Sequence, residues 1–177
     1  TRFGNLGNIL DFDNLTEENI YVLDSPVLTN SQFTKFKKFF AKKMKVIDCT
    51  FDIEKSLKDR IESIKEEAET AVRQGSTCLV LSDKNISNKK ASIPSILTVG
   101  AVHSHLVKHG LRGYCSLNVE CSDAMDTHSF AILIGVGATT VNPYLAIDSI
   151  YQRFEKKLFG QSDFKTCVNK FKKSIDA

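Results

Sequence analysis

Apolar residues recur along the chain with two different spacings, which predict helices and buried strands in alternation. Between Ile53 and Gln74 the apolar positions are three or four residues apart, which is the spacing of one face of an α-helix. The run Thr77–Leu81 is instead almost continuously apolar, as expected for a strand covered on both faces of a sheet. Alternation of the two kinds of segment predicts parallel strands joined by right-handed crossovers.

Over the whole sequence this pattern predicts an α/β fold in the order βαβαβαβαβαα, with no convincing hairpin. The expected strands are 20–23, 45–50, 77–81, 114–120 and 138–141. The expected helices are 31–43, 53–74, 92–109, 127–134, 144–158 and 164–175. Asp52 is the expected N-cap of the second helix, and Asn30 or Ser31 that of the first. Alternating βα units of this kind form an open sheet or part of a barrel, so we expect a partial TIM-barrel-like fold.

The chain has the length of a single domain, 177 residues, in which we distinguish three parts. Residues 1–19 contain glycine, asparagine and aspartate without a period, which predicts an extended lead-in. Residues 20–147 form the expected α/β core, and residues 148–177 form C-terminal helices. Because the chain opens without the start of a domain, we expect it to be a fragment of a longer protein.

The composition excludes several classes of protein. Hydrophobic residues make up 42% of the chain and charged residues 25%, as in ordinary globular proteins. A net charge of +3 is too small to indicate a nucleic-acid partner. No apolar run reaches the roughly 20 residues of a membrane span, so we expect no membrane partner. Five scattered cysteines without a C-x-x-C motif favour free thiols, and we expect an intracellular, reducing compartment.

Polar residues follow several of the predicted strands. Asp48, Asp83 and Glu120 each stand at or near the end of a strand, and Asn142 follows the last one. In parallel α/β folds this edge of the sheet is where ligands and partners bind. Three acids there could bind a cation or a basic group of a partner. The usual role of Asp in turns favours helix capping and solvation instead.

Three histidines lie on the predicted helix 92–109. His105 and His109 are four residues apart and share a face, so they could bind one metal ion. His103 points about 160° away from His105, at 100° per residue, and no acid within this helix completes an H-E-x-x-H motif. The favoured interpretation is that these histidines form hydrogen bonds, so we predict no metal site.

His128 raises the question of catalysis. It lies near Asp126 and seven residues after Cys121, so an acid–base pair and a Cys–His couple are alternatives. No G-x-S-x-G motif supplies a nucleophile, and the favoured interpretation is that Asp126 or Thr127 caps a helix in whose first turn His128 packs. Gly135–Ala138 follows a helix and precedes a strand, which is the reverse of a phosphate-binding loop. We therefore predict no catalytic and no cofactor-binding residue.

The predicted helix 31–43 is amphipathic and basic. A helix of this kind can bind a membrane surface or a calmodulin-like partner. The favoured interpretation is that its aromatic face packs on the sheet while the lysines remain solvated. The aromatic face carries Phe33, Phe36 and Phe40, and the basic side carries Lys35, Lys38 and Lys42.

Several segments, in order along the chain, resemble glutamate synthase, in the central domain of the large glutamine-dependent enzyme. The longest is His128–Ala138 (HSFAILIGVGA), continued by Val141–Ala146 (VNPYLA). The others are Gly4–Leu10, Ser25–Asn30, Asp48–Asp52, Leu79–Lys84 and Ile93–Arg112. The resemblance runs from the start of the chain to about Ile147. It departs from the family pattern at Ser104 and Met125, where the family has a histidine and an arginine.

The resemblance implies a function for the parent enzyme. Glutamate synthases form L-glutamate from L-glutamine and 2-oxoglutarate with a glutaminase domain and a barrel domain that holds FMN and an iron–sulfur cluster. Their electrons come from NADH, NADPH or ferredoxin. The central domain resembles a reduced barrel without a cofactor, joins the two active sites and helps to wall the ammonia channel. This implies that the glutaminase and FMN domains of the same polypeptide are the partners of this chain.

Under this interpretation the chain is not catalytic alone. The residues expected to line the channel or to contact other domains are Asp48, Asp83, His103, His105, Glu120, His128 and Asn142. The alternative is a self-contained flavin- or phosphate-binding α/β barrel oxidoreductase. That alternative requires more strands than the pattern predicts and a phosphate loop that the sequence lacks.

Overall fold

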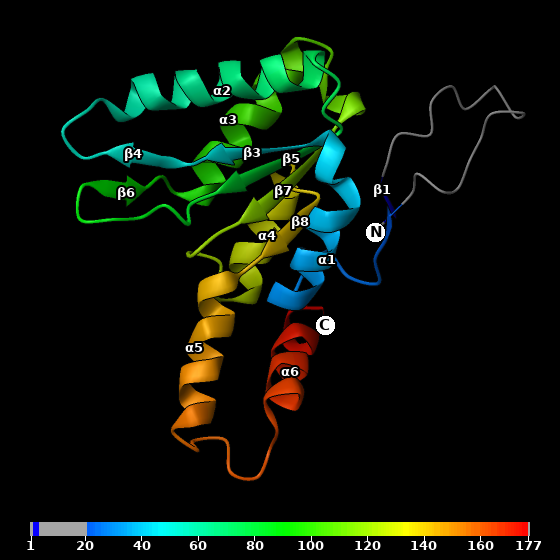
Figure 1. Ribbon diagram of the computed structural model, residues 1–177, viewed down its shortest axis with the longest axis vertical. Helices are drawn as coiled ribbons and strands as arrows, with labels where there is room; N and C mark the ends of the chain where they lie inside the picture. The colour runs from blue at the N-terminus through cyan, green and yellow to red at the C-terminus, as the bar shows by residue number, and fades with distance from the viewer. Residues whose placement is uncertain (1, 4–20, 177) are drawn as a thin grey trace, which may run out of the picture.

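The computed structural model describes residues 2–3 and 21–176 (Figure 1). Most of the expected lead-in, residues 4–20, therefore lies outside the described residues. The strands are β1 (Arg2–Phe3), β2 (Tyr21–Val22), β3 (Met44–Asp48), β4 (Thr50–Asp52), β5 (Cys78–Ser82), β6 (Lys90–Ser92), β7 (Ser116–Glu120) and β8 (Thr140–Asn142). The α-helices are α1 (Asn30–Phe40), α2 (Leu57–Arg73), α3 (Ser95–Lys108), α4 (Thr127–Gly135), α5 (Tyr144–Glu155) and α6 (Phe164–Asp176). Short 3₁₀ helices cover Ala41–Lys43 and Arg112–Tyr114.

Four strands form one parallel sheet in the order β3-β5-β7-β8. Each strand pairs with the strand that follows it in this series, and helices α2, α3 and α4 make the three connections. Sequential pairing is the order found in a βα-barrel, whereas a doubly wound sheet reverses its order at a switch point. The predicted α/β fold with parallel strands is confirmed, and it has the order of a partial barrel.

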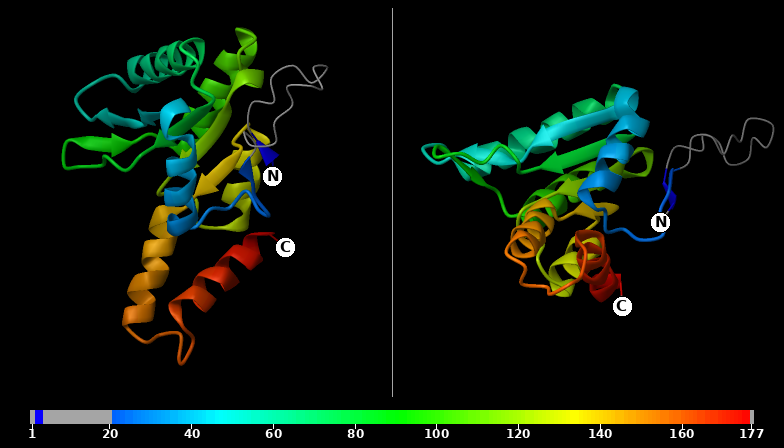
Figure 2. Two further views of the ribbon diagram at one scale, coloured as in Figure 1. Left: turned by 45° about the vertical axis from the view of Figure 1, so that its right-hand side comes forward. Right: turned by 60° about the horizontal axis from the view of Figure 1, so that its bottom comes forward.

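The sheet separates two apolar cores, because successive side chains of a strand point to opposite faces. Leu79 and Leu81 of β5 pack in the core beneath α2, α3 and α4. Cys78 and Val80 of the same strand pack in the second core, beneath α1. Figure 2 shows α1 and α2 on opposite sides of the sheet. In a closed barrel the face beneath α1 would be the interior, so α1 occupies space that the rest of a barrel would use.

The aromatic face of α1 packs on the sheet as predicted. Phe33, Phe36 and Phe40 are buried, with at most 6% of each exposed. The helix is capped by Thr29, which precedes both predicted caps, Asn30 and Ser31. The Thr29 hydroxyl accepts from the backbone N–H of Gln32, and the Gln32 side chain accepts from the Thr29 N–H, which together form a capping box.

The predicted strand 20–23 does not join the parallel sheet, which corrects the expectation of five parallel strands. Its described part, β2, pairs antiparallel with β1. The chain reaches the sheet a few residues later, where Val27 forms a single parallel bridge with Val141. The Val141 N–H donates to the carbonyl of Pro26 at 2.9 Å. Pro26 itself has no N–H to donate, which is consistent with a bridge rather than a full strand.

The predicted strand 45–50 is two strands. At the end of β3, Asp48 Oδ1 accepts from the N–H of Thr50 at 3.0 Å and from its hydroxyl at 2.7 Å. Strand β4 then leaves the sheet and pairs antiparallel with β6, which no predicted strand covers. The two form a ribbon that projects beyond the parallel sheet (Figure 1). The prediction of parallel strands alone is therefore corrected for β4 and β6, which are joined through α2 and β5 and not by a hairpin turn.

This ribbon also moves the starts of two helices. Helix α2 begins at Leu57 rather than Ile53, and its N-cap is Ser56 rather than Asp52. Asp52 instead accepts from the Glu54 N–H at 3.1 Å as the chain leaves β4. Helix α3 begins at Ser95, after the residues that form β6. In both cases pairing within the ribbon removes residues that the helical pattern had included.

Helices α5 and α6 form an antiparallel pair beyond the carboxyl end of β8 (Figure 1). Phe164 of α6 packs against Tyr151 and Phe154 of α5, with ring centroids 5.4 and 5.9 Å apart. Phe171 further along α6 contacts Phe130 of α4, with centroids 6.4 Å apart. Aromatic contacts therefore attach the end of the chain to the core. None of the described helices is long and apolar enough to span a bilayer.

Candidate functional site

The register of the sheet places the polar strand ends in one row. Asp48 pairs with Ser82, Ser82 with Glu120, and Glu120 with Asn142. All four residues therefore lie at the carboxyl edge of the sheet. Asp83 is the next residue after Ser82, so the structure brings together four of the seven candidate residues, Asp48, Asp83, Glu120 and Asn142.

Glu120 lies at the middle of this row, and only 4% of its side chain is exposed. Its Oε1 is 3.1 Å from the ammonium groups of both Lys37 and Lys84, and its Oε2 accepts from the Ser82 hydroxyl at 2.7 Å. Burial tends to raise the pKa of the Glu120 carboxyl, but the hydrogen bonds from Ser82 and the two lysines outweigh it and lower the pKa. Glu120 is therefore an ionised carboxylate whose contacts are made within the chain.

Asp83 is also buried, with 3% exposed. Its Oδ2 accepts from the Ser92 hydroxyl and from both the N–H and hydroxyl of Ser122, at 2.6 to 3.1 Å. Its Oδ1 is the one buried side-chain oxygen without a hydrogen-bond partner in the described part of the chain. Burial raises the pKa of the neighbouring Tyr144 phenol, and the Asp83 carboxylate raises it further. Asp83 thus ties the end of β5 to the last residue of β6 and to the loop that follows β7.

Asp48 has partners of its own at the outer end of the row. Besides Thr50, its Oδ2 lies 3.6 Å from the ammonium group of Lys90 on β6. Burial acts to raise the pKa of the Asp48 carboxyl, but the Thr50 hydrogen bonds and Lys90 lower it overall. The three acids share an edge, yet each makes its hydrogen bonds and ion pairs with separate neighbours. They do not form one cation site.

Asn142 connects the row to a pocket. Its amide nitrogen donates to the carbonyl of Leu28 at 2.9 Å and to the side-chain oxygen of Asn30 at 3.0 Å. Asn30 in turn donates to Asp148 of α5 at 3.3 Å. This chain of hydrogen bonds fixes the start of α1 against the end of β8 and the first turns of α5.

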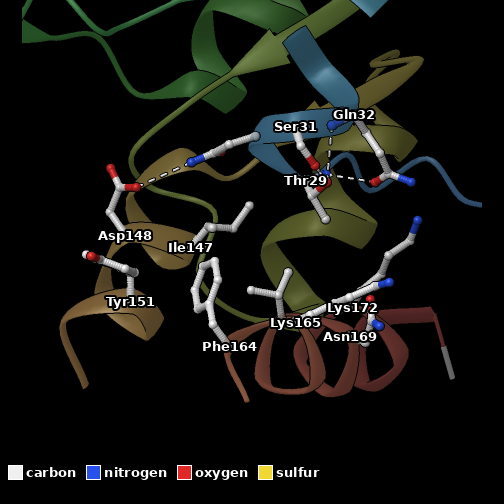
Figure 3. Close-up of a pocket in the computed structure, with 12 residues that line it drawn as sticks. Thr29, Ser31, Gln32, Ile147, Asp148, Tyr151, Phe164, Lys165, Asn169 and Lys172 are labelled. Atoms are coloured by element: carbon white, nitrogen blue, oxygen red, sulfur yellow. Dashed lines mark hydrogen bonds between the residues drawn. The ribbon is translucent and has the colours of Figure 1, made fainter. Parts of the chain in front are cut away.

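The pocket lies between the amino end of α1 and the α5–α6 pair, and its volume is about 670 Å³. Figure 3 shows Asp148 and Tyr151 on its α5 side, and Phe164, Lys165 and Asn169 on its α6 side. No sequence pattern predicts this pocket, because α1 contributes one wall and α5 and α6, more than a hundred residues later in the chain, contribute the other.

The three remaining candidate residues lie elsewhere. His103 accepts from Arg112 Nε at 3.1 Å, and burial together with the Arg112 charge lowers the pKa of its imidazole. His105 Nε2 lies 2.7 Å from Glu69 Oε2 on α2. The N-cap of α4 is Asp126, one of the two predicted caps, but His128 in its first turn is exposed, which corrects the expectation that it packs there. The structure therefore does not bring His103, His105 and His128 together in one site.

The Gly137 turn does not have the form of a phosphate-binding loop, and the cysteines are not arranged as ligands of an iron–sulfur cluster. Gly137 closes α4 in a positive-φ conformation (φ 118°), and a Cβ there would lie 2.3 Å from His103 Nδ1, so this turn packs against protein rather than cradling a phosphate. All five cysteines are buried and free, and no three of them converge. Burial raises the pKa of both Cys49 and Cys78 to about 12, which keeps them as thiols.

The chain is a parallel α/β domain whose strands follow one another in the order of a partial barrel. The polar side chains at the carboxyl ends of these strands form their contacts within the chain. The family model of the glutamate synthase central domain matches residues 1–177, and the chain belongs to that family.

Curated relatives agree with this assignment. The chain is 44% identical to the glutamate synthase [NADPH] large chain of Azospirillum brasilense, over 99% of this chain and 12% of that protein. It is 40% identical to the Bacillus subtilis NADPH large chain, over 86% of this chain and 10% of that protein. It is 38% identical to the chloroplastic ferredoxin-dependent enzyme of Spinacia oleracea, over 84% of this chain and 10% of that protein. The chain thus spans about a tenth of the length of these relatives.

Proposed function

We propose that this chain serves as the connecting domain of a glutamate synthase, where it joins the glutaminase and FMN domains and helps to wall the ammonia channel between them. In this role it performs no chemistry itself. The observation that carries the proposal is the match of the central-domain model to the whole chain. The carboxyl edge of the sheet supports it, because Glu120 and Asp83 are held by neighbours in the chain rather than displayed to a substrate.

The parent reaction follows from the same proposal. The whole enzyme would form L-glutamate from L-glutamine and 2-oxoglutarate, with FMN and an iron–sulfur cluster held by domains outside this chain. Relatives named as NADPH-dependent and as ferredoxin-dependent both align with it, so either electron donor is compatible with this domain. Its free, buried cysteines favour a reducing compartment inside the cell.

Two parts of the site are proposed as contacts with neighbouring domains. The first is the carboxyl edge of the sheet, whose shape the mostly buried row of Asp48, Asp83, Glu120 and Asn142 supports from within. The second is the pocket beside α5, where Asp148 and Tyr151 are exposed. An open pocket with charged and aromatic side chains is a suitable surface for a segment of an adjoining domain.

The test is to measure coupling in the full-length enzyme that contains this chain. Asp148→Arg and Tyr151→Arg should release free ammonia and lower the glutamate formed per glutamine consumed, because a displaced domain opens the passage. Lys58→Glu, on the exposed side of α2, is the matched control and should leave the ratio unchanged. Unchanged coupling in both pocket variants would contradict the assignment of this surface.

A second measurement tests the proposal that this chain binds no flavin and has no glutaminase activity. The purified 177-residue chain should be colourless after preparation with excess FMN and should show no glutaminase activity. A yellow protein with stoichiometric flavin would overturn the proposal and favour the self-contained flavin barrel.

A further inference from the structure

Helices α2 and α3 bring together three metal-ligating side chains that are remote in sequence. His105 lies in the last turn of α3 and His109 is the C-cap of that helix, and Glu69 reaches them from α2. His105 Nε2 is 2.7 Å from Glu69 Oε2, and His109 Nδ1 is 3.8 Å from the same oxygen. One ligand atom from each residue falls within 4.8 Å of the others, and this is the one such group of three in the part of the chain that the structure describes.

We propose that Glu69, His105 and His109 form a binding site for a divalent transition metal, with Zn²⁺ as the best match. Two imidazoles and one carboxylate are a ligand set that zinc accepts, with water in the fourth position. Ligand atoms of a tetrahedral zinc site lie roughly 3.3 Å apart, as bond lengths near 2 Å require. His105 Nε2 and Glu69 Oε2 are already closer than that value, and rotation of the His109 ring has to bring its free nitrogen to the same point to close the site.

Neighbouring groups already orient two of the three ligands. His109 Nδ1 lies 2.8 Å from the carbonyl oxygen of His105, so an N–H there donates to it and leaves Nε2 as the free ring nitrogen. Arg73 binds Glu69 Oε1 at 2.8 Å, which leaves Oε2 directed at the histidines. Partners of this kind, a carbonyl behind a histidine and a donor behind a carboxylate, are the usual outer contacts of metal sites.

The site is accessible and separate from the carboxyl edge of the sheet. About a third of the His109 side chain is exposed (35%), and Glu69 and His105 are 21% and 14% exposed. Both helices run back from the carboxyl to the amino edge of the sheet, and the three residues lie in their C-terminal halves. A metal there would tie α2 to α3 at the amino edge and would act as a structural link, independently of the proposed channel.

The test uses the 177-residue chain without a histidine tag, titrated with Zn²⁺ alone and followed by calorimetry. We expect one Zn²⁺ per chain and a higher melting temperature in its presence. His109→Asn should weaken binding at least tenfold, as should Glu69→Gln, and both should lose the thermal shift. His128→Asn, an exposed helical histidine outside the cluster, is the matched control and should bind as the unchanged chain does.

The visible absorption spectrum with Co²⁺ in place of Zn²⁺ shows whether nitrogen and oxygen atoms or thiolates bind the metal. Co²⁺ should give the visible bands of a tetrahedral nitrogen–oxygen site, without a thiolate charge-transfer band. Equal Zn²⁺ affinity in the unchanged chain and in the folded His109→Asn variant would overturn the proposal. A thiolate band, or failure of the unchanged chain to bind Zn²⁺ below millimolar concentrations, would also overturn it.

Discussion

Lys37 and Glu120 are 83 positions apart in sequence, yet their charged groups lie 3.1 Å apart and join α1 to the carboxyl end of β7. Lys84 makes the same contact from the loop after β5. One buried carboxylate therefore holds a helix on one face of the sheet to a loop at its edge. The Glu120 carboxylate is the shared partner of both lysines, so the two contacts depend on a single side chain.

Replacing Glu120 by Gln should lower the free energy of unfolding by about 1–3 kcal/mol, the usual contribution of hydrogen bonds to a buried charged group. The amide keeps the shape but cannot balance two ammonium groups. Urea denaturation at pH 7 measures the change. Glu66→Gln, on the exposed side of α2, is the control and should stay within about 0.5 kcal/mol of the unchanged chain.

The Glu120 contribution should also depend on pH. Its pKa in the folded chain lies below the ordinary value of 4.5, so its stabilisation is present above that value and is lost as the pH falls through the folded-state pKa. The difference in unfolding free energy between the unchanged chain and Glu120→Gln should therefore be constant from pH 7 to 5 and shrink below about 4.5. Denaturation curves at several pH values test this. A difference that grows on acidification would contradict the ionised state assigned to Glu120.

Gly137→Ala should destabilise the chain more than Gly75→Ala. Both glycines have positive φ, 118° and 91°, so both substitutions strain the backbone by about 1–3 kcal/mol. A Cβ at Gly75 meets nothing within 4 Å, whereas one at Gly137 would collide with His103. We expect an additional loss of at least about 1 kcal/mol for Gly137→Ala, measured by urea denaturation.

The His103 ring is the source of that difference. Adding His103→Ala to Gly137→Ala should recover part of the additional loss, because the collision is removed. If the two glycine variants were equally stable, the close packing of Gly137 against His103 would be refuted.

Phe36→Ala should cost about 3–5 kcal/mol, because this ring is fully buried between α1 and the sheet. Phe39→Ala, in the same helix, removes a ring that is 48% exposed and should cost roughly 1 kcal/mol. Thermal and urea unfolding of the two variants give the comparison. Similar losses would mean that the aromatic face of α1 is not the one that holds the helix to the sheet.

Periodicity was sufficient for the central elements, since α2 and β5 bury regular sets of apolar residues and little else competes for them. It was insufficient where tertiary pairing overrides a local pattern. The prediction placed Thr50, the first residue of β4, in the same strand as β3, because a turn made by the hydrogen bonds of one side chain, Asp48, is not visible in the hydrophobic pattern. Strand β6 has a polar sequence, Lys90–Ser92, and is defined only by its partner.

The candidate functional residues likewise fall into two groups, those that the sequence pattern predicts and those that it does not. The four strand-end residues could be predicted, because parallel strands align their carboxyl ends. Glu69 could not, because it lies 36 residues before His105 and reaches it only through packing of α2 on α3. A helix-by-helix search for H-E-x-x-H motifs finds acids on the same helix as the histidines and overlooks those supplied by a neighbour.

The position of α1 limits what protein engineering can make from this domain. Its phenylalanines cover the face of the sheet opposite α2, α3 and α4, where the side chains of four further strands would have to pack in an eight-stranded ring. Appending βα units to either edge would therefore extend the sheet but leave it open. Conversion to a complete ring would require excision of α1 first, together with its lysine contact to Glu120.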